Sequence, residues 1–265
     1  MVTQSRQNGQ SMGVLIVALL CVVAIGSLQI PQLNKLKNTS INASVAELNK
    51  EVESEKFRLN LLRKFPSFGF NNLVADWTFL NFLQYFGDDA PRAKTGYSLS
   101  PEYFEVILNR DPYFLRAYFF LSGSTTLYAG MPDRTIAIME KGLKHLSPKV
   151  PFKSYYIWRY KGMNELLFTA NPQAAKQSFE TAAQWASIYF DDESKNVARV
   201  SQQTAKFIDK NSQSKSAQIS AWSMVLTNAL DDRTRNFAIA KIRALGGDIS
   251  ITPQGEVRII LPKKD

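Results

Sequence analysis

Apolar residues along most of the chain recur every three or four positions, and this spacing predicts α-helices from residue 44 to residue 247. Proline marks predicted helix boundaries at Pro112, Pro132 and Pro148, and we expect residues 88–100, DDAPRAKTGYSLS, to be a loop. The period changes to two over residues 248–265, where DISI and VRIIL flank a Pro-Gln-Gly turn and predict a short β-hairpin with a basic tail. The pattern therefore predicts an all-α fold with a C-terminal β-hairpin.

One uncharged stretch near the N-terminus differs from the rest of the chain. Residues 12–28 read MGVLIVALLCVVAIGSL and carry no charge, whereas Arg6 precedes them and Lys35 follows. A helix of this length spans about 25 Å, close to the thickness of a bilayer's hydrocarbon core, and the next two residues can extend it. We expect residues 12–30 to be a single transmembrane anchor.

The anchor divides the N-terminal region into a polar tail, residues 1–11, and a polar linker, residues 31–43. A cleaved signal peptide is the alternative to an anchor, because Ala24 and Gly26 have the small side chains that a signal peptidase requires. By the usual logic of signal anchors, we expect the body on the lumenal or periplasmic side of a single-pass membrane protein.

The helical domain, residues 44–247, begins with a capping signal. Ser44 and Glu47 have the spacing of a capping box, and Pro66 ends the helix that they start. The next stretch, FGFNNLVADWTFLNFLQYFGDD, is apolar around its whole circumference, although its Asn and Gln side chains argue against a second membrane span. We expect it to be a core helix covered on nearly all sides, in which Asp76 is buried and needs a polar partner.

A helix-turn-helix unit occurs at least twice in the middle of the chain. The clearer copy joins SYYIWRYKGMNELLFTA to QAAKQSFETAAQWASIYF through an Asn-Pro turn. Small residues let two helices approach closely where a bulky residue of the partner fills the groove between them. The residues expected to pack this hairpin are Trp158, Gly162, Ala175, Phe179 and Ala182. Their spacing resembles the tetratricopeptide repeat, and the resemblance implies an α-solenoid of stacked hairpins.

A second resemblance covers about residues 65–257. It is clearest at FGFNNLVADWTFLNFLQYFGDD, SPEYFEVILNRDP, DDRTRNFAIAKIRALGG and SITPQGEV. The chain resembles a family of N-terminally anchored repeat proteins common in cyanobacteria, to which no secure activity is assigned. The resemblance implies a thylakoid or plasma membrane location.

The formal net charge is +9, and most of this excess is spread thinly along the chain. One window, residues 141–164, holds six basic residues interleaved with aromatic residues and no acidic residue. Such a mixture can anchor a peptide in a groove. The residues that we expect to bind a partner are Lys149, Lys153, Tyr156, Arg159 and Tyr160.

Motifs of catalysis and cofactor binding are missing from the sequence. It holds no phosphate-binding loop, no dinucleotide fingerprint, no HExxH and no nucleophile elbow, and it has one histidine and one cysteine. Asp76 and Glu165 are the only candidates for paired catalytic carboxylates. Acidic pairs such as Asp191-Asp192 and Asp231-Asp232 stand at helix boundaries, where we expect them to cap helices. We therefore expect no enzyme, no cofactor and no metal site.

Together these features predict a membrane-anchored scaffold that binds another protein during assembly or maintenance of a membrane protein complex. The alternatives are a permanent structural subunit of a photosynthetic or respiratory complex and an accessory protein of polysaccharide export. We expect protein partners at the membrane and no small-molecule substrate. Nucleic acid is not an expected partner either, since the basic excess is modest and the anchor restricts access to DNA.

Overall fold

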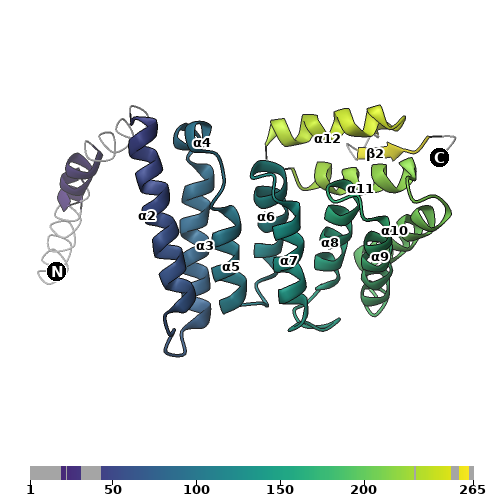
Figure 1. Cartoon of the computed structure of the whole chain (residues 1–265), viewed down its shortest axis with the longest axis horizontal. Coiled ribbons are helices and arrows are strands. Elements are labelled where there is room, and N and C mark those ends of the chain that lie inside the picture. Colours follow the sequence, from purple (N-terminus) through teal and green to yellow (C-terminus); the bar gives the residue numbers. More distant parts are fainter. Residues whose placement is uncertain (1–18, 22, 31–42, 230, 252–256, 263–265) are drawn as a thin grey trace, which may run out of the picture. The chain divides into compact units, whose positions relative to one another are not determined.

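The computed structural model describes residues 19–21, 23–30, 43–229, 231–251 and 257–262. Most of these residues are helical, as the sequence predicts (Figure 1). The elements are α2 (Val45–Lys64), α3 (Asn71–Gly87), α4 (Asp89–Thr95), α5 (Ser100–Arg110), α6 (Leu115–Leu121), η1 (Ser122–Tyr128), α7 (Pro132–Leu143), α8 (Tyr155–Leu167), α9 (Pro172–Ala186), α10 (Asp192–Lys210), α11 (Lys215–Thr227), α12 (Asp232–Ala244), β1 (Asp248–Ile251) and β2 (Val257–Ile260).

The chain divides into two compact units, the first made of residues 1–52 and 88–95 and the second of residues 53–87 and 96–265. In the first unit, the N–H of Ser44 donates to Glu47 Oε2 at 2.8 Å and the N–H of Glu47 donates to Ser44 Oγ at 3.2 Å. This reciprocal pair is the predicted capping box, and it satisfies two backbone donors at the start of α2.

The predicted anchor lies only partly within the described residues. Residues 19–21 and 23–30 are helical. The rest of the predicted 12–30 span, the N-terminal tail and all of the 31–43 linker except Ala43 lie outside the described residues. Among the helices that the structure describes, none is both long and apolar enough to cross a membrane.

Residues 89–95 form the short helix α4, where the sequence predicted a loop. Pro91 lies in the first turn of α4, where its missing N–H costs no hydrogen bond. The hydroxyl of Thr95 donates to the carbonyl oxygen of Pro91 at 3.0 Å and closes the last turn. Pro91, which we expected in a loop, therefore lies in the first turn of a helix.

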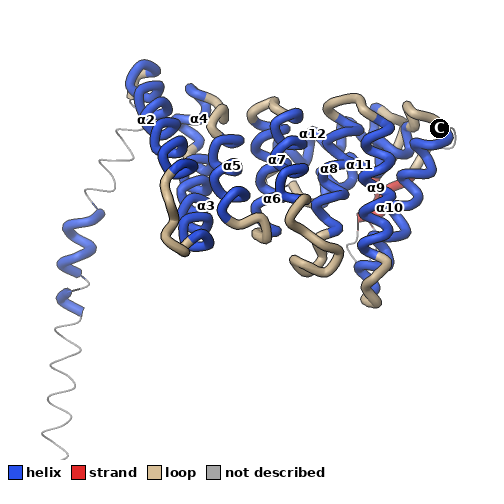
Figure 2. Tube along the Cα trace, turned by 60° about the horizontal axis from the view of Figure 1, so that its bottom comes forward, coloured by secondary structure: helices blue, strands red, loops and turns tan. Residues whose placement is uncertain are grey.

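In the second unit, the helices pack largely in chain order. α3 packs on α5, α5 on α6 and α7, α7 on α8, α8 on α9, and α9 on α10. α11 contacts both α10 and α8, and α12 packs on α11. α11 and α12 run across the direction of α5 and α7 (Figure 1). Figure 2 shows that helix makes up most of the described trace, with the strand segment near its C-terminal end.

The core between α3, α5 and α6 is built from aromatic rings. Phe82 is fully buried, and its ring centroid lies 4.6 Å from that of Phe104. Phe79 meets Phe114 and Phe120 edge-on at 4.9 Å and 5.3 Å. Such edge-to-face pairs contribute about 0.5–1.5 kcal/mol each beyond the burial of their area. This cluster covers the inner face of α3.

The outer face of α3 is exposed, so the expectation that this helix is covered nearly all round is wrong. Leu73, Trp77 and Leu80 form one stripe along α3 and are 65%, 59% and 57% exposed. Asp76 lies exposed beside this stripe, and the prediction that it is buried is also wrong. The sequence shows that both faces of α3 are apolar, but the described fold packs helices against only one of them.

The hairpin of α8 and α9 has the close approach that its small residues predict. A Cβ built on Gly162 would lie 3.1 Å from Phe179 Cδ2, tighter than an ordinary carbon contact. Phe179 is buried on α9, as are Ala175 and Ala182. Trp158 is only half-buried, and it meets Trp185 of α9 edge-on with centroids 5.9 Å apart.

The two strands of the predicted C-terminal hairpin form in the structure. Asp231 Oδ1 accepts the N–H of Thr234 at 2.8 Å and caps α12, and Gly246 ends the helix at a φ of +83°. β1 and β2 then pair antiparallel, with Ile249 opposite Ile259. The alternating apolar pattern and the cap signals therefore predicted both strands and the end of α12, whereas the predicted turn and the basic tail at 263–265 lie outside the described residues.

Candidate binding groove

Two adjoining cavities of the second unit form a groove beside α8. The apolar cavity has a volume of about 300 Å³ and lies between α3, α6, η1, α8, α11 and the start of α12. The arginine cavity has a volume of about 500 Å³ and lies between α8, α10 and α11. The residues that line both cavities are Phe119, Tyr160, Met224 and Asn228. These volumes fall within the range in which proteins bind ligands or anchor side chains.

Phe119 forms the wall between the two cavities. Its ring centroid lies 5.0 Å from that of Tyr160 and 6.0 Å from that of Tyr156. Phe119 projects from α6 and both tyrosines project from α8, so the three rings tie these helices together. The result is a continuous aromatic surface that runs from one cavity into the other.

The helix η1 gives the apolar cavity its shape. It is a π-helix, and it supplies five of the lining residues: Ser122, Gly123, Ser124, Leu127 and Tyr128. The hydroxyl of Ser124 donates to the carbonyl oxygen of Phe120 at 2.7 Å, a local bond that competes with regular helix geometry. π-helical turns are rare and occur often at functional sites. The segment begins with SGSTT, for which the sequence pattern predicts an ordinary α-helix.

A buried polar network fixes the back of the apolar cavity. Asn164 Nδ2 donates to Ser122 Oγ at 2.9 Å and to the carbonyl oxygen of Tyr160 at 2.7 Å. The hydroxyl of Thr126 contacts Asn164 Oδ1 at 2.6 Å and the hydroxyl of Thr135 at 2.9 Å. All the side chains of this network are buried, and they join η1, α7 and α8. A satisfied network of this kind rigidifies the wall that it supports.

Arg159 brings an unpaired cation to the groove. It lines the arginine cavity from α8, and its Nε atom is buried without a hydrogen-bond partner among the described residues. Within the part of the chain that the structure describes, its guanidinium makes no ion pair. Burial lowers the pKa of Arg159, and burial raises the pKa of the neighbouring Tyr160 to about 12. The phenol is therefore neutral at physiological pH and cannot compensate the arginine.

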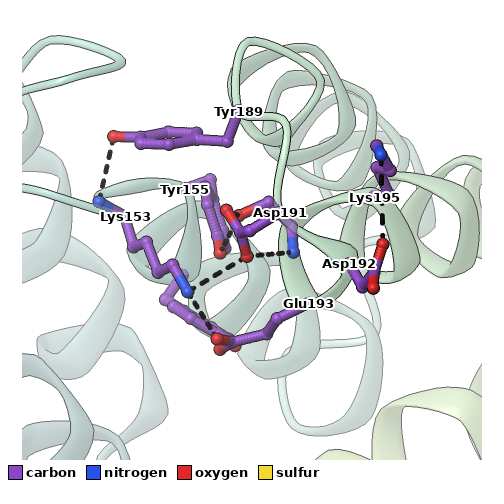
Figure 3. A network of polar contacts seen from close by, with 9 residues as sticks. Lys153, Tyr155, Tyr189, Asp191, Asp192, Glu193 and Lys195 are labelled. Atoms are coloured by element: carbon purple, nitrogen blue, oxygen red, sulfur yellow. Dashed lines mark hydrogen bonds and ion pairs between the residues drawn. The ribbon is translucent and has the colours of Figure 1, made fainter.

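Lys153, by contrast, is held by an acidic cluster at the start of α10. Figure 3 shows its Nζ atom directed toward Asp191 and Glu193. Nζ lies 3.3 Å from Asp191 Oδ1 and also pairs with Glu193, to which the hydroxyl of Tyr156 donates. The backbone N–H of Lys153 donates to the hydroxyl of Tyr189 at 3.0 Å. Lys153 thus ties the α7–α8 connection to the α9–α10 turn.

Asp191 is the fixed centre of this cluster. Its carboxylate accepts the N–H of Ser194 at 3.0 Å and the hydroxyl of Ser194 at 2.7 Å, which caps α10 as predicted. Hydrogen bonds from Ser194, followed by the charge of Lys153, lower the pKa of Asp191 from 3.8 to about 2. The carboxylate is therefore ionised throughout the physiological range and keeps Lys153 in place.

The five predicted binding residues do not form one surface. Tyr156, Arg159 and Tyr160 line the groove together, since positions three and four apart share one face of α8. Lys153 is engaged in the cluster at α10, and Lys149 is exposed in the α7–α8 connection outside the groove. We grouped these five residues because they are close in sequence. Both lysines precede α8, however, whereas the other three residues lie on it.

Other groove residues come from distant parts of the chain. Phe119 lies on α6, Met163 on α8, and Met224 and Asn228 at the end of α11. No local pattern distinguishes these side chains from ordinary core residues. Only the contact between α8 and α11, which are not neighbours in sequence, brings them together.

The two carboxylates considered for catalysis do not converge. Glu165 is buried, pairs with Lys161, and accepts the hydroxyl of Ser178 at 2.6 Å. Lys161 Nζ also lies 3.3 Å from Glu140. Asp76 is exposed on α3 and takes no part in this cluster. Among the described residues, no group of three or more His, Cys, Asp or Glu could hold a metal ion.

Comparisons with protein-family models, with curated proteins and with solved structures find no match for this chain. The function must therefore be argued from the groove itself. Its two cavities, its aromatic wall and its unpaired guanidinium are the features that bear on binding.

Proposed function

We propose that this protein is a membrane-anchored scaffold whose groove binds a segment of another protein during assembly or maintenance of a membrane protein complex. The observation that carries the proposal is the groove, in which an aromatic wall adjoins an unpaired arginine. Central binding residues of protein interfaces are enriched in tyrosine, tryptophan and arginine. Met163 and Met224 add flexible apolar surface that adapts to different side chains.

The arrangement of the helices supports a binding role. We infer that the second unit is an α-solenoid of tetratricopeptide-like hairpins, because α8 and α9 pack through Gly162 and Phe179 and the helices from α5 to α10 pack in chain order. In such folds each hairpin contacts chiefly its neighbours, so the residues of an open face can vary without disturbing the core. The groove residues of α6 and α8 would belong to that face.

The membrane part of the proposal rests on residues 12–30. Their length and lack of charge support a single-pass anchor, and a cleaved signal peptide is the alternative. We place the anchor in a thylakoid or plasma membrane, with the body on the lumenal or periplasmic side. An anchor would confine the groove to partners at the same membrane and would raise their effective concentration.

An activity other than binding has less support. The carboxylate of Glu165 is occupied by Lys161 and Ser178, and Asp76 is not near it in the fold. Half of the polar side chains that line the arginine cavity are amides and phenols, which suit recognition of a peptide.

The proposal is tested by crosslinking and affinity purification from solubilised membranes at the natural expression level. The full chain, the chain without residues 1–30, and the full chain with Phe119→Arg are compared. A scaffold should recover a partner in substoichiometric amounts, and Phe119→Arg should abolish recovery while an exposed control, Lys149→Gln, should not. Recovery at a constant ratio to one complex would indicate a permanent subunit instead. Recovery that Phe119→Arg leaves unchanged would contradict a role for the groove.

A further inference from the structure

Some of the charged side chains that line the groove have a partner in the structure and others have none. Two carboxylates line it, and both are engaged: Glu193 by Lys153 and Tyr156, and Asp231 by the N–H of Thr234 at 2.8 Å. The groove also has two guanidiniums, those of Arg159 and Arg116, and neither has an acidic partner among the residues that the structure describes. Lys153 neutralises Glu193, so Arg159 is left in the arginine cavity as a cation that no carboxylate of the described residues pairs with.

Burial makes the lack of a partner for Arg159 costly in free energy. A buried polar atom without a hydrogen bond loses about 1–3 kcal/mol relative to water, and more if it is charged. The Nε of Arg159 is such an atom, and the nearby phenols of Tyr156 and Tyr160 are neutral because burial raises their pKa. A native protein keeps an unsatisfied group of this kind where strain, an ion or a ligand explains it.

The chemistry of arginine indicates which chemical group the ligand should carry. A guanidinium presents its N–H donors in a planar fork that matches a carboxylate with two parallel hydrogen bonds. Arg116 adds positive charge from α6, three positions before Phe119 and so on the same face of the helix. Phe119 separates the two cavities that these arginines line, and the apolar cavity beside it takes an uncharged side chain.

We propose that the groove binds a peptide segment in which an aspartate or glutamate side chain pairs with Arg159, while a neighbouring apolar side chain of the same segment enters the apolar cavity. The inference rests on the proposed function, since it specifies the segment that the scaffold binds. The net charge of +9 also favours the approach of an acidic segment.

The test begins with selection of phage-displayed random dodecapeptides on the full chain in detergent micelles. The peptides retained should combine Asp or Glu with an aliphatic or aromatic residue within a few positions. One retained peptide is then synthesised with its acidic residue and with the corresponding amide, and both are titrated against four proteins. These are the wild type, Arg159→Gln, Arg159→Lys and the exposed control Lys149→Gln.

The amide peptide should bind the wild type at least tenfold more weakly than the acidic peptide, and Arg159→Gln should cause a similar loss with the acidic peptide. The two changes together should cost little more than either alone, because they remove the same pair. Arg159→Lys should restore only part of the affinity, since an ammonium lacks the planar fork. Lys149→Gln should bind like the wild type.

Two results would overturn the inference, and they differ in what they imply for the proposed function. If peptides bind and Phe119→Arg prevents it, but acidic and amide peptides bind equally, the groove is a peptide site without a carboxylate preference. If no peptide is retained, or if Phe119→Arg binds as well as the wild type, both the inference and the groove function fail. Unfolding midpoints of all variants, measured in the same micelles, show that each is folded.

Discussion

The ring of Phe179 packs directly against Gly162, and a Cβ at Gly162 would stand 3.1 Å from Phe179 Cδ2. This contact sets the distance between α8 and α9. Gly162 lies roughly 200° around α8 from Tyr160, so the face of α8 that packs on α9 is opposite the face that lines the groove. The glycine therefore helps to orient the binding residues without touching them.

Replacing Gly162 should weaken this hairpin. Gly162→Ala should lower the free energy of unfolding by about 1–3 kcal/mol through overpacking against Phe179. The loss should occur although alanine is intrinsically the better helix former by about 1 kcal/mol. Chemical denaturation of the full chain in detergent micelles measures the change. Gly87→Ala is the matched control, because a Cβ at Gly87 meets nothing within 4 Å. Equal stability of the two variants would refute the close packing of α8 on α9.

The buried pair of Lys161 and Glu165 should be sensitive to loss of either partner. Glu165→Ala leaves a buried ammonium without its main counter-charge and should cost about 3–5 kcal/mol of unfolding free energy. The double variant Lys161→Met, Glu165→Leu should recover most of this loss, since two apolar side chains need no partner. The change is measured by denaturant titration.

An exposed ion pair is the control for this prediction. Asp209 pairs with Lys176 at 2.5 Å on the surface, and Asp209→Ala should leave the unfolding midpoint almost unchanged. A loss of the same size for Asp209→Ala and Glu165→Ala would mean that burial does not decide the energy of the Lys161 pair.

The cap at Asp191 predicts an acid dependence of stability. Its pKa falls from 3.8 to about 2 in the folded state, so the folded state binds the proton less tightly than the unfolded state does. The stabilisation by Asp191 is therefore complete above about pH 4, and it is lost as the pH falls toward 2. The unfolding midpoint, followed from pH 6 to pH 2, should decrease in this window. Asp191→Asn should flatten this part of the curve, whereas Asp192→Asn, whose side chain does not cap the helix, should not.

Asp76 is exposed in the structure, so its loss should have little effect on stability. The sequence alone, which predicts a buried Asp76, leads to the opposite expectation. Asp76→Ala should change the free energy of unfolding by no more than about 0.5 kcal/mol, as is usual for surface substitutions. Phe82→Ala, on the covered face of the same helix, should cost about 3–5 kcal/mol. A strong destabilisation by Asp76→Ala would show that the outer face of α3 is covered in the protein.

Local signals in the sequence predicted the elements of the fold well. Ser44, Asp191 and Asp231 start helices in the structure as their side chains predict, and the alternating residues of β1 and β2 pair as expected. Two predictions were wrong. Residues 89–95 form α4 because Pro91 lies in its first turn, where a missing N–H costs no hydrogen bond. The outer face of α3 is exposed because the described fold packs no helix on it.

Of the candidate site, the sequence predicted only residues on the single helix α8. Tyr156, Arg159 and Tyr160 follow from the spacing of basic and aromatic residues on α8. Phe119 and Met224 could not be predicted, since they lie far away in sequence and have no distinguishing pattern. The π-helical turn of η1 was missed too, because the bond from the hydroxyl of Ser124 to the carbonyl oxygen of Phe120 also occurs in regular helices, as between Thr204 and Val200 in α10.

The central claim, that the groove holds a segment of another protein, is tested most directly by placing a photoreactive amino acid in it. Benzoylphenylalanine replaces Phe119 or, as an exposed control outside the groove, Phe190, in the full chain within its native membrane. After irradiation, mass spectrometry identifies the crosslinked peptides. We predict one defined protein segment attached at Phe119 and absent at Phe190. No adduct at Phe119, an adduct to lipid only, or the same adducts at both positions would contradict the account.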